Sequence, residues 1–306
     1  LCDLDLETAQ GISPRDSIPL YTDYREMMEQ NPAIDVVALA TPSGLHAYQA
    51  MAIMTRWGKS IVVEKPPALS LLSFDEMWSE AKARHLEIFP VFQYRFNSAV
   101  QRCKRAVRDQ VLGKLNVVSI RQRWCRAQQY YDQATWRGTY SLDGGALTNQ
   151  GVHHLDLIQY LAGPVTEVSA MQGTFGSDID VEDTMTATFR FKSGAIGSLE
   201  ITTAVRPNDV ESSVSLIGSD GYATIGGWAT DKLSAFSPQS EDIETYSQSN
   251  ADAYGYGHVN IYEGVVETLS GRGSPAVSMV EARQTLLLLH ALYVSASEGS
   301  RVEVSD

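Results

Sequence analysis

The stretch Asp35-Val36-Val37-Ala38-Leu39-Ala40 decides the fold of the first third of the chain. It is a nearly continuous apolar run, bounded by Asn31-Pro32 before it and Thr41-Pro42 after it. Such a run predicts a strand that is buried on both faces within a parallel sheet. Two further runs of this kind, Ile61–Val63 and Ile88–Phe92, predict two more strands of the same sheet.

Helix-like segments lie between these runs. Residues 24–30 follow Thr22-Asp23, which are good N-cap residues, and residues 45–57 stop at Gly58. A third segment, 73–85, has Ser73 as its candidate N-cap. Strands and helices that alternate with short connections predict a doubly wound α/β sheet.

The pattern changes after about residue 115. From Thr184 to Phe191 polar and apolar side chains alternate, which is the period of a strand with one face in water. Turns at 192–194 and 218–221 join further strand-like segments, at 195–204, 213–217 and 222–225. Consecutive hairpins predict an antiparallel sheet, and three helices are expected to cover one side of it, at 146–162, 257–271 and 278–297. The second part of the chain is therefore expected to be α+β.

Composition bounds the class of protein. The 306 residues correspond to roughly two domains at about 150 residues each, and the boundary is expected between Gln93 and Ser98. Lys and Arg number 24 against 37 Asp and Glu, so the net charge is −13. Nucleic acids and anionic membranes reward a basic face, so neither is an expected partner. No run approaches ~18 consecutive apolar residues, so no membrane-spanning helix is expected.

The N-terminal residues and the cysteines suggest the compartment. Leu1-Cys2-Asp3 lacks the layout of a signal peptide, and the missing initiator Met suggests that the native start lies upstream. The three scattered cysteines have neither a disulfide framework nor zinc-ligand spacing; they are Cys2, Cys103 and Cys125. We expect a reduced, cytoplasmic protein with no metal site.

Glu64-Lys65-Pro66 is the first candidate for chemistry. It follows a predicted buried strand, and ligands of open α/β sheets bind at the carboxyl ends of the strands. A Lys at this place can act as an acid or a base. The alternative is a surface Glu–Lys pair before a turn-forming Pro.

The second candidate is the segment from Gly144 to Tyr160. If it is helical, Asn149, His153, Asp156 and Tyr160 form one polar stripe. A His between an amide and a carboxylate can be held in one tautomer, which suits a general base or a ligand for a substrate hydroxyl. The alternative is a polar stripe that faces water. His154 points elsewhere and is expected to pack or to be exposed.

Four segments, in this order, resemble the Gfo/Idh/MocA oxidoreductase family: Thr41-Pro42-Ser43-Gly44-Leu45-His46, Glu64-Lys65-Pro66, Gln93-Tyr94-Arg95-Phe96 and Asn149–Asp156. The resemblance implies a dinucleotide-binding Rossmann domain over residues 1–95 that begins near its second strand, without the glycine-rich phosphate loop. It also implies an α+β domain over residues 96–306 for substrate binding and oligomerisation, with a large, mostly antiparallel sheet. Homodimers or homotetramers are then expected.

The resemblance also implies NAD(P) and the oxidation of a sugar or cyclitol hydroxyl. Lys65 and His153 would be the catalytic pair, and the Lys65–Pro66 bond is expected to be cis. Asn149 stands where many members have Asp, so it would hold the substrate or orient His153 but cannot be a carboxylate base. Asp3 matches the acidic residue that binds the adenosine ribose, which favours NAD over NADP; the alternatives are a turn role for Asp3, or Asp5 in its place. The cofactor-binding residues would be Asp3, Thr41, Pro42, Ser43, Leu45, His46, Glu64, Lys65 and Gln93.

Further segments resemble one branch of that family, which oxidises UDP-linked N-acetyl-hexosamine uronates at C3. They are Trp136–Tyr140, Asp143–Gly151 and Tyr254-Gly255-Tyr256-Gly257-His258. The implied function is oxidation of UDP-N-acetylglucosaminuronate in polysaccharide biosynthesis; the alternatives are a cyclitol or free-sugar dehydrogenase and a non-catalytic sugar or dinucleotide sensor. Aromatic rings can stack on the flat face of a sugar or base, and arginines can bind its phosphate or carboxylate. For Arg121 and Arg123 the alternative is a strand with arginines on its solvated face. The substrate-binding residues would be Lys65, Arg126, Tyr131, Trp136, Arg137, Asn149, His153 and His258.

Overall fold

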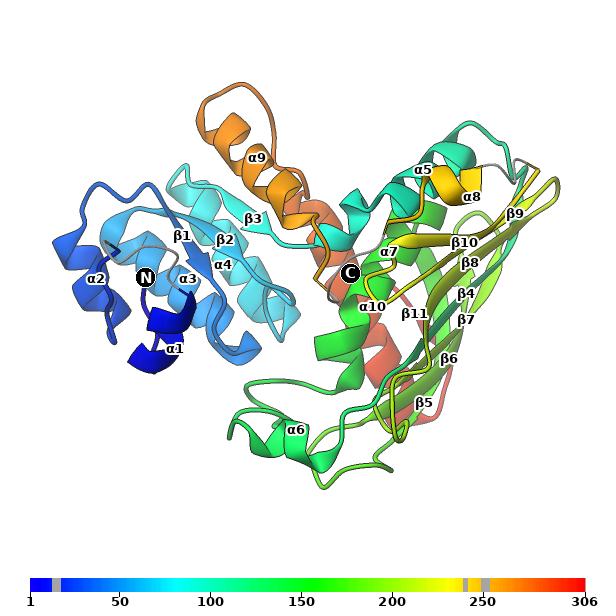
Figure 1. Cartoon of the computed structure of the whole chain (residues 1–306), viewed down its shortest axis with the longest axis horizontal. Coiled ribbons are helices and arrows are strands. Elements are labelled where there is room, and N and C mark those ends of the chain that lie inside the picture. Colours follow the sequence, from blue (N-terminus) through cyan, green and yellow to red (C-terminus); the bar gives the residue numbers. More distant parts are fainter. Residues whose placement is uncertain (13–17, 239–241, 249–253, 306) are drawn as a thin grey trace.

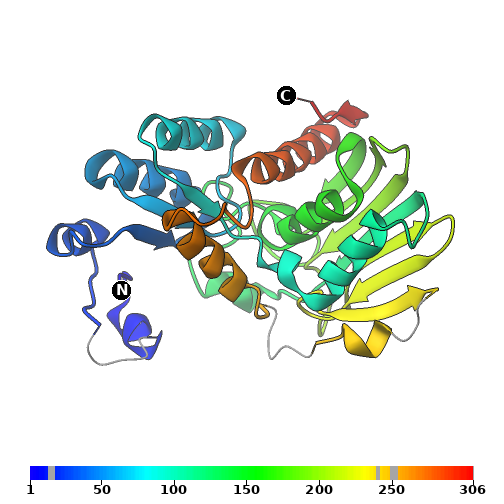
Figure 2. The ribbon, with the colours of Figure 1, turned by 90° about the horizontal axis from the view of Figure 1, so that it is seen from above.

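The computed structural model describes residues 1–12, 18–238, 242–248 and 254–305. Its first sheet has three parallel strands in the order β1 (Val36–Leu39), β2 (Ser60–Val63) and β3 (Ile88–Pro90). All four residues of β2 are buried, as its continuous apolar run predicts. Helices α3 (His46–Trp57) and α4 (Leu71–Ala83) cover one face of this sheet (Figure 2). The predicted parallel α/β sheet is confirmed.

The starts of two helices differ from the sequence prediction. Helix α4 begins two residues earlier, because Ser70 and not Ser73 is its N-cap: the Ser70 hydroxyl oxygen accepts a hydrogen bond from the Ser73 backbone N–H at 3.1 Å. Helix α3 is preceded by a 3₁₀ turn, η1 (Ser43–Leu45). Helix α2 (Tyr24–Gln30) has the predicted bounds, whereas α1 (Leu6–Ile12) was not predicted.

The second sheet has eight strands in the order β10-β9-β8-β4-β7-β6-β5-β11. Only the β4–β7 pair is parallel, so the predicted mostly antiparallel sheet is confirmed. The strands are β4 (Leu115–Arg123), β5 (Val165–Gly173), β6 (Thr184–Phe191), β7 (Ile196–Thr202), β8 (Glu211–Gly218), β9 (Tyr222–Gly226), β10 (Lys232–Ser237) and β11 (Val302–Glu303).

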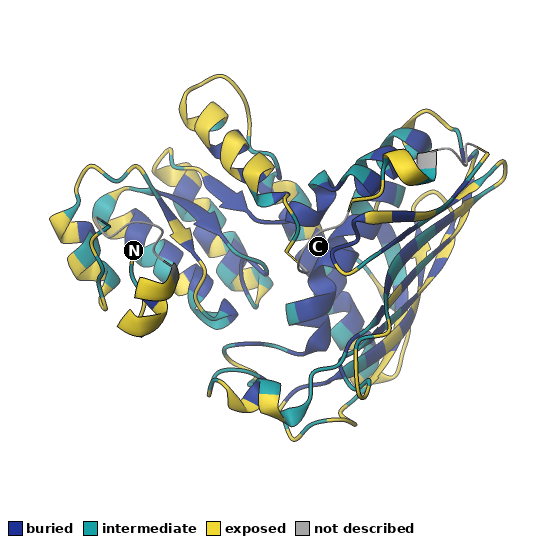
Figure 3. Ribbon diagram, viewed as in Figure 1, coloured by how far each residue is buried: buried dark blue, intermediate teal, exposed yellow. Residues whose placement is uncertain are grey.

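Helices lie against one face of this sheet (Figure 1). They are α5 (Ser98–Arg108), α7 (Val152–Ala162) and α10 (Met279–Glu298). Strand β6 alternates buried and exposed residues, and Figure 3 shows exposed residues on the opposite face, which no described helix covers. The remaining described helices are shorter or lie at the edges: η2 (Gln93–Phe96), α6 (Gln128–Asp132), the π-helical turn η3 (Leu147–Gly151), α8 (Asp242–Thr245) and α9 (His258–Leu269). Two of the three predicted helices lie on the sheet, whereas the predicted helix of residues 257–271 packs on η2 instead and α5 takes its place on the sheet.

A buried ion pair lies where the chain passes from the first sheet to the second. Arg95 of η2 makes two hydrogen bonds to Asp156 of α7, at 2.7 and 2.6 Å, and one to Glu281 of α10 at 2.6 Å. Both members of the Arg95–Asp156 pair are at most 5% exposed. The pair therefore joins three helical elements at this junction, and the domain division at residues 95/96 stays a prediction. Within the described part of the chain, no helix combines the length and apolarity needed to cross a bilayer.

Candidate active site

The predicted site residues gather at the carboxyl ends of the three parallel strands. Thr41 follows β1, Glu64 and Lys65 follow β2, and Gln93 follows β3. The Lys65 ammonium donates a hydrogen bond to the backbone carbonyl of Asn149 at 2.7 Å, which joins the first sheet to η3. Burial lowers the pKa of Lys65, while the nearby carboxylates of Glu64 and Asp143 oppose this effect. The Lys65–Pro66 bond is cis, as expected from the resemblance.

His46 holds two of these loops together. Its Nδ1 lies 2.8 Å from the Pro66 carbonyl oxygen, and its Nε2 lies 2.8 Å from the Thr41 carbonyl oxygen. The ring is 1% exposed. His46 therefore positions the loops that follow β1 and β2. Burial lowers its pKa, so the neutral ring donates to one of the two carbonyls at a time, and its contact with the cofactor stays a prediction.

The loop after β1 also makes a close contact with the second part of the chain. The Gly44 backbone N–H donates to the Leu142 carbonyl at 2.9 Å, and a side chain at position 44 would overlap the Ser141 carbonyl. Ser43 is buried, while Pro42 and Leu45 are partly exposed. This contact places the predicted cofactor loop 41–46 beside the segment that leads to Asn149.

His258 meets Glu64. The His258 Nε2 lies 3.2 Å from a Glu64 carboxylate oxygen, and both side chains are about a third exposed, at 30% and 31%. Burial would raise the pKa of Glu64, but the His258 hydrogen bond and the Lys65 charge outweigh it and lower that pKa. A side chain at position 257 would overlap the Gln93 carbonyl. The 254–258 segment, which begins 164 residues after the end of β3 in the sequence, therefore closes one side of the site.

His153 is oriented by aromatic rings. It stacks on Tyr94, with ring centroids 4.2 Å apart and planes at 22°, and meets Phe92 edge-on at 6.2 Å. Neither ring nitrogen has a hydrogen-bond partner among the described residues, and Nδ1 is fully buried. Burial, and then the charge of Lys65, lower the pKa of His153 well below its ordinary value, so the ring is neutral near pH 7.

The polar stripe is confirmed in part, because His153, Asp156 and Tyr160 all contact η2, but its predicted role of orienting the His153 ring is wrong. Asp156 is bound to Arg95, and the Asn149 side-chain amide donates to the carboxylate of Asp143, so neither residue orients the His153 ring. Asn149 lies in the π-helical turn η3, which has more residues in each turn than an α-helix, so the α-helical spacing from which the stripe was predicted does not hold there.

Asp143 is a site residue that the sequence analysis did not assign. Besides Asn149, its carboxylate accepts a hydrogen bond from the Gly138 backbone N–H at 2.7 Å. Burial raises the pKa of Asp143, opposed by these two hydrogen bonds and by the charges of Lys65 and Arg137. Through its hydrogen bonds to Gly138 and Asn149, Asp143 links the loop that carries Arg137 to the residue whose carbonyl binds Lys65. The signal in the sequence was the position of Asp143 directly before the Gly144-Gly145 pair.

The loop around α6 carries two arginines among aromatic rings. The Arg137 guanidinium lies 4.2 Å from the Tyr130 ring centre and 5.6 Å from that of Trp136. The Arg126 guanidinium lies 4.8 Å from the Trp124 ring centre and 3.3 Å from the Asp209 carboxylate. These contacts keep cations and flat faces together, the combination predicted for a sugar-nucleotide.

Three other residues of this region have internal roles. Tyr131 is 7% exposed, and its hydroxyl is hydrogen-bonded to Thr203 at 3.1 Å; its contact with the substrate stays a prediction. Arg123 binds Glu200 at 2.6 Å and Arg121 lies 3.9 Å from Glu211, so both belong to the solvated face of the sheet, which was the alternative for them.

Asp3 lies apart from the other predicted cofactor residues. Its carboxylate accepts from the Asp5 backbone N–H at 2.9 Å, which is the turn role, and its own N–H donates to Tyr21 at 3.0 Å. Asp5 in turn binds the backbone N–H of Glu7 at 3.0 Å, at the start of α1, and so is used as a cap. A ribose contact by Asp3 stays a prediction.

The residues present fit a nicotinamide cofactor. The Gln93 side-chain oxygen is buried without a hydrogen-bond partner at the end of β3, where a carboxamide N–H would satisfy it. The described residues contain no group of three His, Cys, Asp or Glu side chains placed to hold a metal ion.

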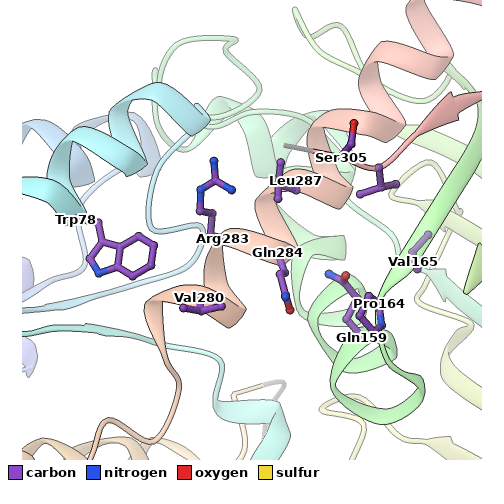
Figure 4. A pocket seen from close by; sticks show the side chains of 10 residues that line it. Trp78, Gln159, Pro164, Val165, Val280, Arg283, Gln284, Leu287 and Ser305 are labelled. Atoms are coloured by element: carbon purple, nitrogen blue, oxygen red, sulfur yellow. The ribbon is translucent and has the colours of Figure 1, made fainter. Parts of the chain in front are cut away.

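A hollow of about 510 Å³ lies elsewhere, between α4, α7, α10 and β5. Figure 4 shows Trp78, Gln159, Arg283 and Gln284 around it. It contains none of the residues that meet at Lys65, so we place the site at the strand ends and not in this hollow.

Comparison with known proteins shows the family of this chain. The model of the oxidoreductase family with an NAD-binding Rossmann fold matches residues 1–92, and that of the GFO/IDH/MocA C-terminal domain matches residues 100–224. Among curated proteins, levoglucosan dehydrogenase of Pseudarthrobacter phenanthrenivorans is 27% identical, over 92% of this chain and 83% of the relative.

Two solved structures are closely similar. The WlbA dehydrogenase from Bordetella pertussis, in complex with NADH and UDP-GlcNAcA, has a TM-score of 0.92 and 32% identity, over 100% of this chain and 89% of that chain. The WlbA dehydrogenase from Chromobacterium violaceum, in complex with the same two molecules, has a TM-score of 0.89 and 34% identity, over 99% and 86%. Both halves of the fold thus have counterparts in NAD-binding dehydrogenases, and this chain belongs to the Gfo/Idh/MocA family of NAD-dependent oxidoreductases.

Proposed function

We propose that this enzyme oxidises a secondary hydroxyl, at C3, of a nucleotide-linked hexosamine uronate such as UDP-N-acetylglucosaminuronate. The observation that carries the proposal is that Asp143 links the Arg137 loop to the partner of Lys65. Its carboxylate accepts the N–H of Gly138, which directly follows Arg137, and the side-chain amide of Asn149, whose carbonyl accepts the Lys65 ammonium. A guanidinium suits phosphate or carboxylate groups, and aromatic faces suit a sugar or a base. The likeness to two WlbA dehydrogenases, whose structures contain UDP-GlcNAcA, supports this substrate class.

Lys65 is the proposed acid–base group. A lysine with an ordinary pKa holds its proton too strongly to accept another group's proton near pH 7. Burial lowers the pKa of Lys65, and a bound nicotinamide cation would lower it further because like charges disfavour the ammonium form. Neutral Lys65 can then take the proton of the substrate hydroxyl, while the Asn149 carbonyl holds the Nζ in place.

His153 is proposed to position that hydroxyl. It is neutral and has no hydrogen-bond partner among the described residues, so a ring nitrogen is free to accept from or donate to the substrate. Stacking on Tyr94 fixes the plane of the ring. His153 therefore supplies direction to the substrate, and its low pKa makes it the weaker of the two bases.

NAD, when bound, accepts the hydride that leaves the carbinol carbon. The loop 41–45 and the Gln93 side chain would hold its nicotinamide end, and Asp3 would contact its adenosine ribose. The open face of the large sheet is the proposed contact surface of a homodimer or homotetramer. A reducing cytoplasm and a role in polysaccharide biosynthesis complete the proposal.

A second candidate is a cyclitol or free-sugar dehydrogenase. Levoglucosan dehydrogenase and, at 25% identity, the myo-inositol 2-dehydrogenase of Thermotoga maritima are relatives over more than nine-tenths of this chain. These substrates have no phosphate and need neither Arg126 nor Arg137.

The test is NADH formation at 340 nm with UDP-N-acetylglucosaminuronate, levoglucosan and myo-inositol. We expect kcat/KM to be highest for the UDP-sugar and to fall about tenfold or more in Arg137→Ala, because a hydrogen bond to a charged group is worth roughly 1.5–3 kcal/mol. Arg121→Ala, on the solvated strand, is the matched control and should be unchanged. Preference for a free sugar, with Arg137→Ala unaffected, selects the second candidate.

Lys65→Met tests the proposed base with the substrate that the panel selects. Loss of a positioned acid–base group should lower kcat about 10²–10⁴-fold, while the Kd of NAD changes little. Near-normal turnover in the folded variant would remove Lys65 from the reaction.

A further inference from the structure

Glu182 is a buried carboxylate outside the residues considered so far. It lies two residues before β6 and is 7% exposed. One of its carboxylate oxygens accepts the Leu147 backbone N–H at 2.9 Å and the Tyr293 hydroxyl at 2.9 Å. The backbone carbonyl of Glu182 accepts the Ala146 N–H at 2.9 Å. One residue therefore binds two successive N–H groups at the start of η3.

The glycine pair gives this carboxylate its space. A Cβ at position 145 would overlap the Glu182 carboxylate, so only Gly fits there while Glu182 keeps its place. Gly144, its neighbour, has φ +79°, a conformation that other residues rarely adopt. The Gly144-Gly145 pair is thus matched to Glu182, which lies 37 residues beyond Gly145 in the sequence.

The turn η3, which Glu182 binds, contains Asn149, whose backbone carbonyl is the hydrogen-bond partner of Lys65. Asn149 belongs to η3, two residues after Leu147, and its backbone N–H donates to the Gly145 carbonyl at 2.9 Å. Its own carbonyl accepts the Lys65 ammonium at 2.7 Å. Tyr293 of α10 closes the same turn from the other side, because its hydroxyl also lies 2.8 Å from that of Thr148.

We propose that Glu182 is a positioning residue that fixes the first turn of η3 and thereby holds the Asn149 carbonyl on the Lys65 ammonium. The carboxylate does not reach the reacting atoms, and it acts on Lys65 only through the backbone of residues 145–149. A hydrogen bond from a charged donor favours the charged form, so loss of this carbonyl should lower the pKa of Lys65. This inference rests on the proposed role of Lys65.

The experiment compares Glu182→Ala with Glu182→Gln. The glutamine oxygen can still accept from Leu147 and Tyr293, so Glu182→Gln should keep kcat within about twofold. Glu182→Ala should lower kcat about tenfold and leave the KM for NAD nearly unchanged. It should also move the acidic limb of the kcat–pH profile, along which Lys65 loses its proton, down by about one pH unit. Ser295→Ala is the matched control. The Ser295 hydroxyl, on α10, is another buried acceptor and binds the backbone N–H of Ala170. Its loss should lower Tm and leave kcat and the kcat–pH profile unchanged.

Gly145→Ala tests the route of the effect. The added methyl group displaces the carboxylate, so this variant should have the kinetic defect of Glu182→Ala. In the double variant Gly145→Ala/Glu182→Ala the methyl group meets no carboxylate, so its kcat should be no lower than that of Glu182→Ala alone. Additive losses would show that the two residues act separately and would overturn the proposed route.

A substrate-independent measurement separates this inference from the proposed function. The ε-¹³C signal of Lys65, assigned by its absence in Lys65→Met, can be titrated by NMR in the NAD complex of each variant. A lower Lys65 pKa in Glu182→Ala, even if no UDP-sugar is oxidised, supports the positioning role while the proposed substrate fails. An unchanged Lys65 titration, with a loss of Tm like that of Ser295→Ala, reduces Glu182 to a structural residue and overturns the inference.

Discussion

At the scale of single residues, the adjacent histidines should separate chemistry from stability. His154 is 0% exposed, its Nε2 lies 3.0 Å from the Ser212 hydroxyl, and burial lowers its pKa to about 4. His154→Asn should therefore cost about 1–3 kcal/mol of unfolding free energy and keep kcat. His153→Asn should lower kcat about 10²-fold or more, because the ring that directs the substrate hydroxyl is lost. Urea unfolding and NADH formation measure the two effects. If His154→Asn is the inactive variant, the assignment of His153 fails.

For the candidate active site, the sequence predicted the elements that carry Lys65 and His153 better than it predicted the hydrogen-bond partners of the site residues. Lys65 could be placed because a buried strand ends just before it, and its Asn149 carbonyl partner could not, since that contact depends on a π-helical turn. The separation of His153 from His154 follows from helical geometry alone. The partner of Asp156 is Arg95, 61 residues away, and no local pattern indicates such a pair.

At the scale of elements, Glu182 joins η3, α10 and the start of β6, and it should make stability depend on pH. Burial raises its pKa from an ordinary 4.5 to about 7. The folded state therefore binds a proton that the unfolded chain has released between these values, so the contribution of Glu182 to stability is greatest below pH 4.5 and is lost as the pH rises through 7. This loss amounts to at most about 3 kcal/mol. Glu182→Gln cannot titrate and should lack it, so the difference in urea midpoint between the two proteins should grow from pH 5 to pH 8. A constant difference would show that Glu182 is ionised throughout.

Elements with one clear period were predictable, and those that depend on tertiary contacts were not. The continuous apolar run of β2 and the alternation of β6 each permit one interpretation. The order of the eight strands, with β4 between β7 and β8, follows from long-range pairing that no turn signal reveals. The start of α4 was missed because Ser70 and Ser73 are both good caps.

At the scale of the whole molecule, cofactor binding should stabilise the fold and distinguish NAD from NADP. The loops after β1, β2 and β3 and the distant 254–258 segment meet at one edge, so NAD bound there contacts only the folded chain. At 100 times its Kd, NAD should add about 2.7 kcal/mol to the free energy of unfolding, and Tm should rise accordingly. NADP should raise Tm less, because its 2′-phosphate would lie near the Asp3 carboxylate and like charges repel. Asp3→Asn should reduce the difference between the Tm shifts that NAD and NADP cause. Asp35→Asn, at another exposed acidic residue, is the matched control and should leave that difference unchanged. Equal shifts with NAD and NADP in the unaltered protein would show that Asp3 does not contact the ribose, while the shift itself would still report on the strand-end site.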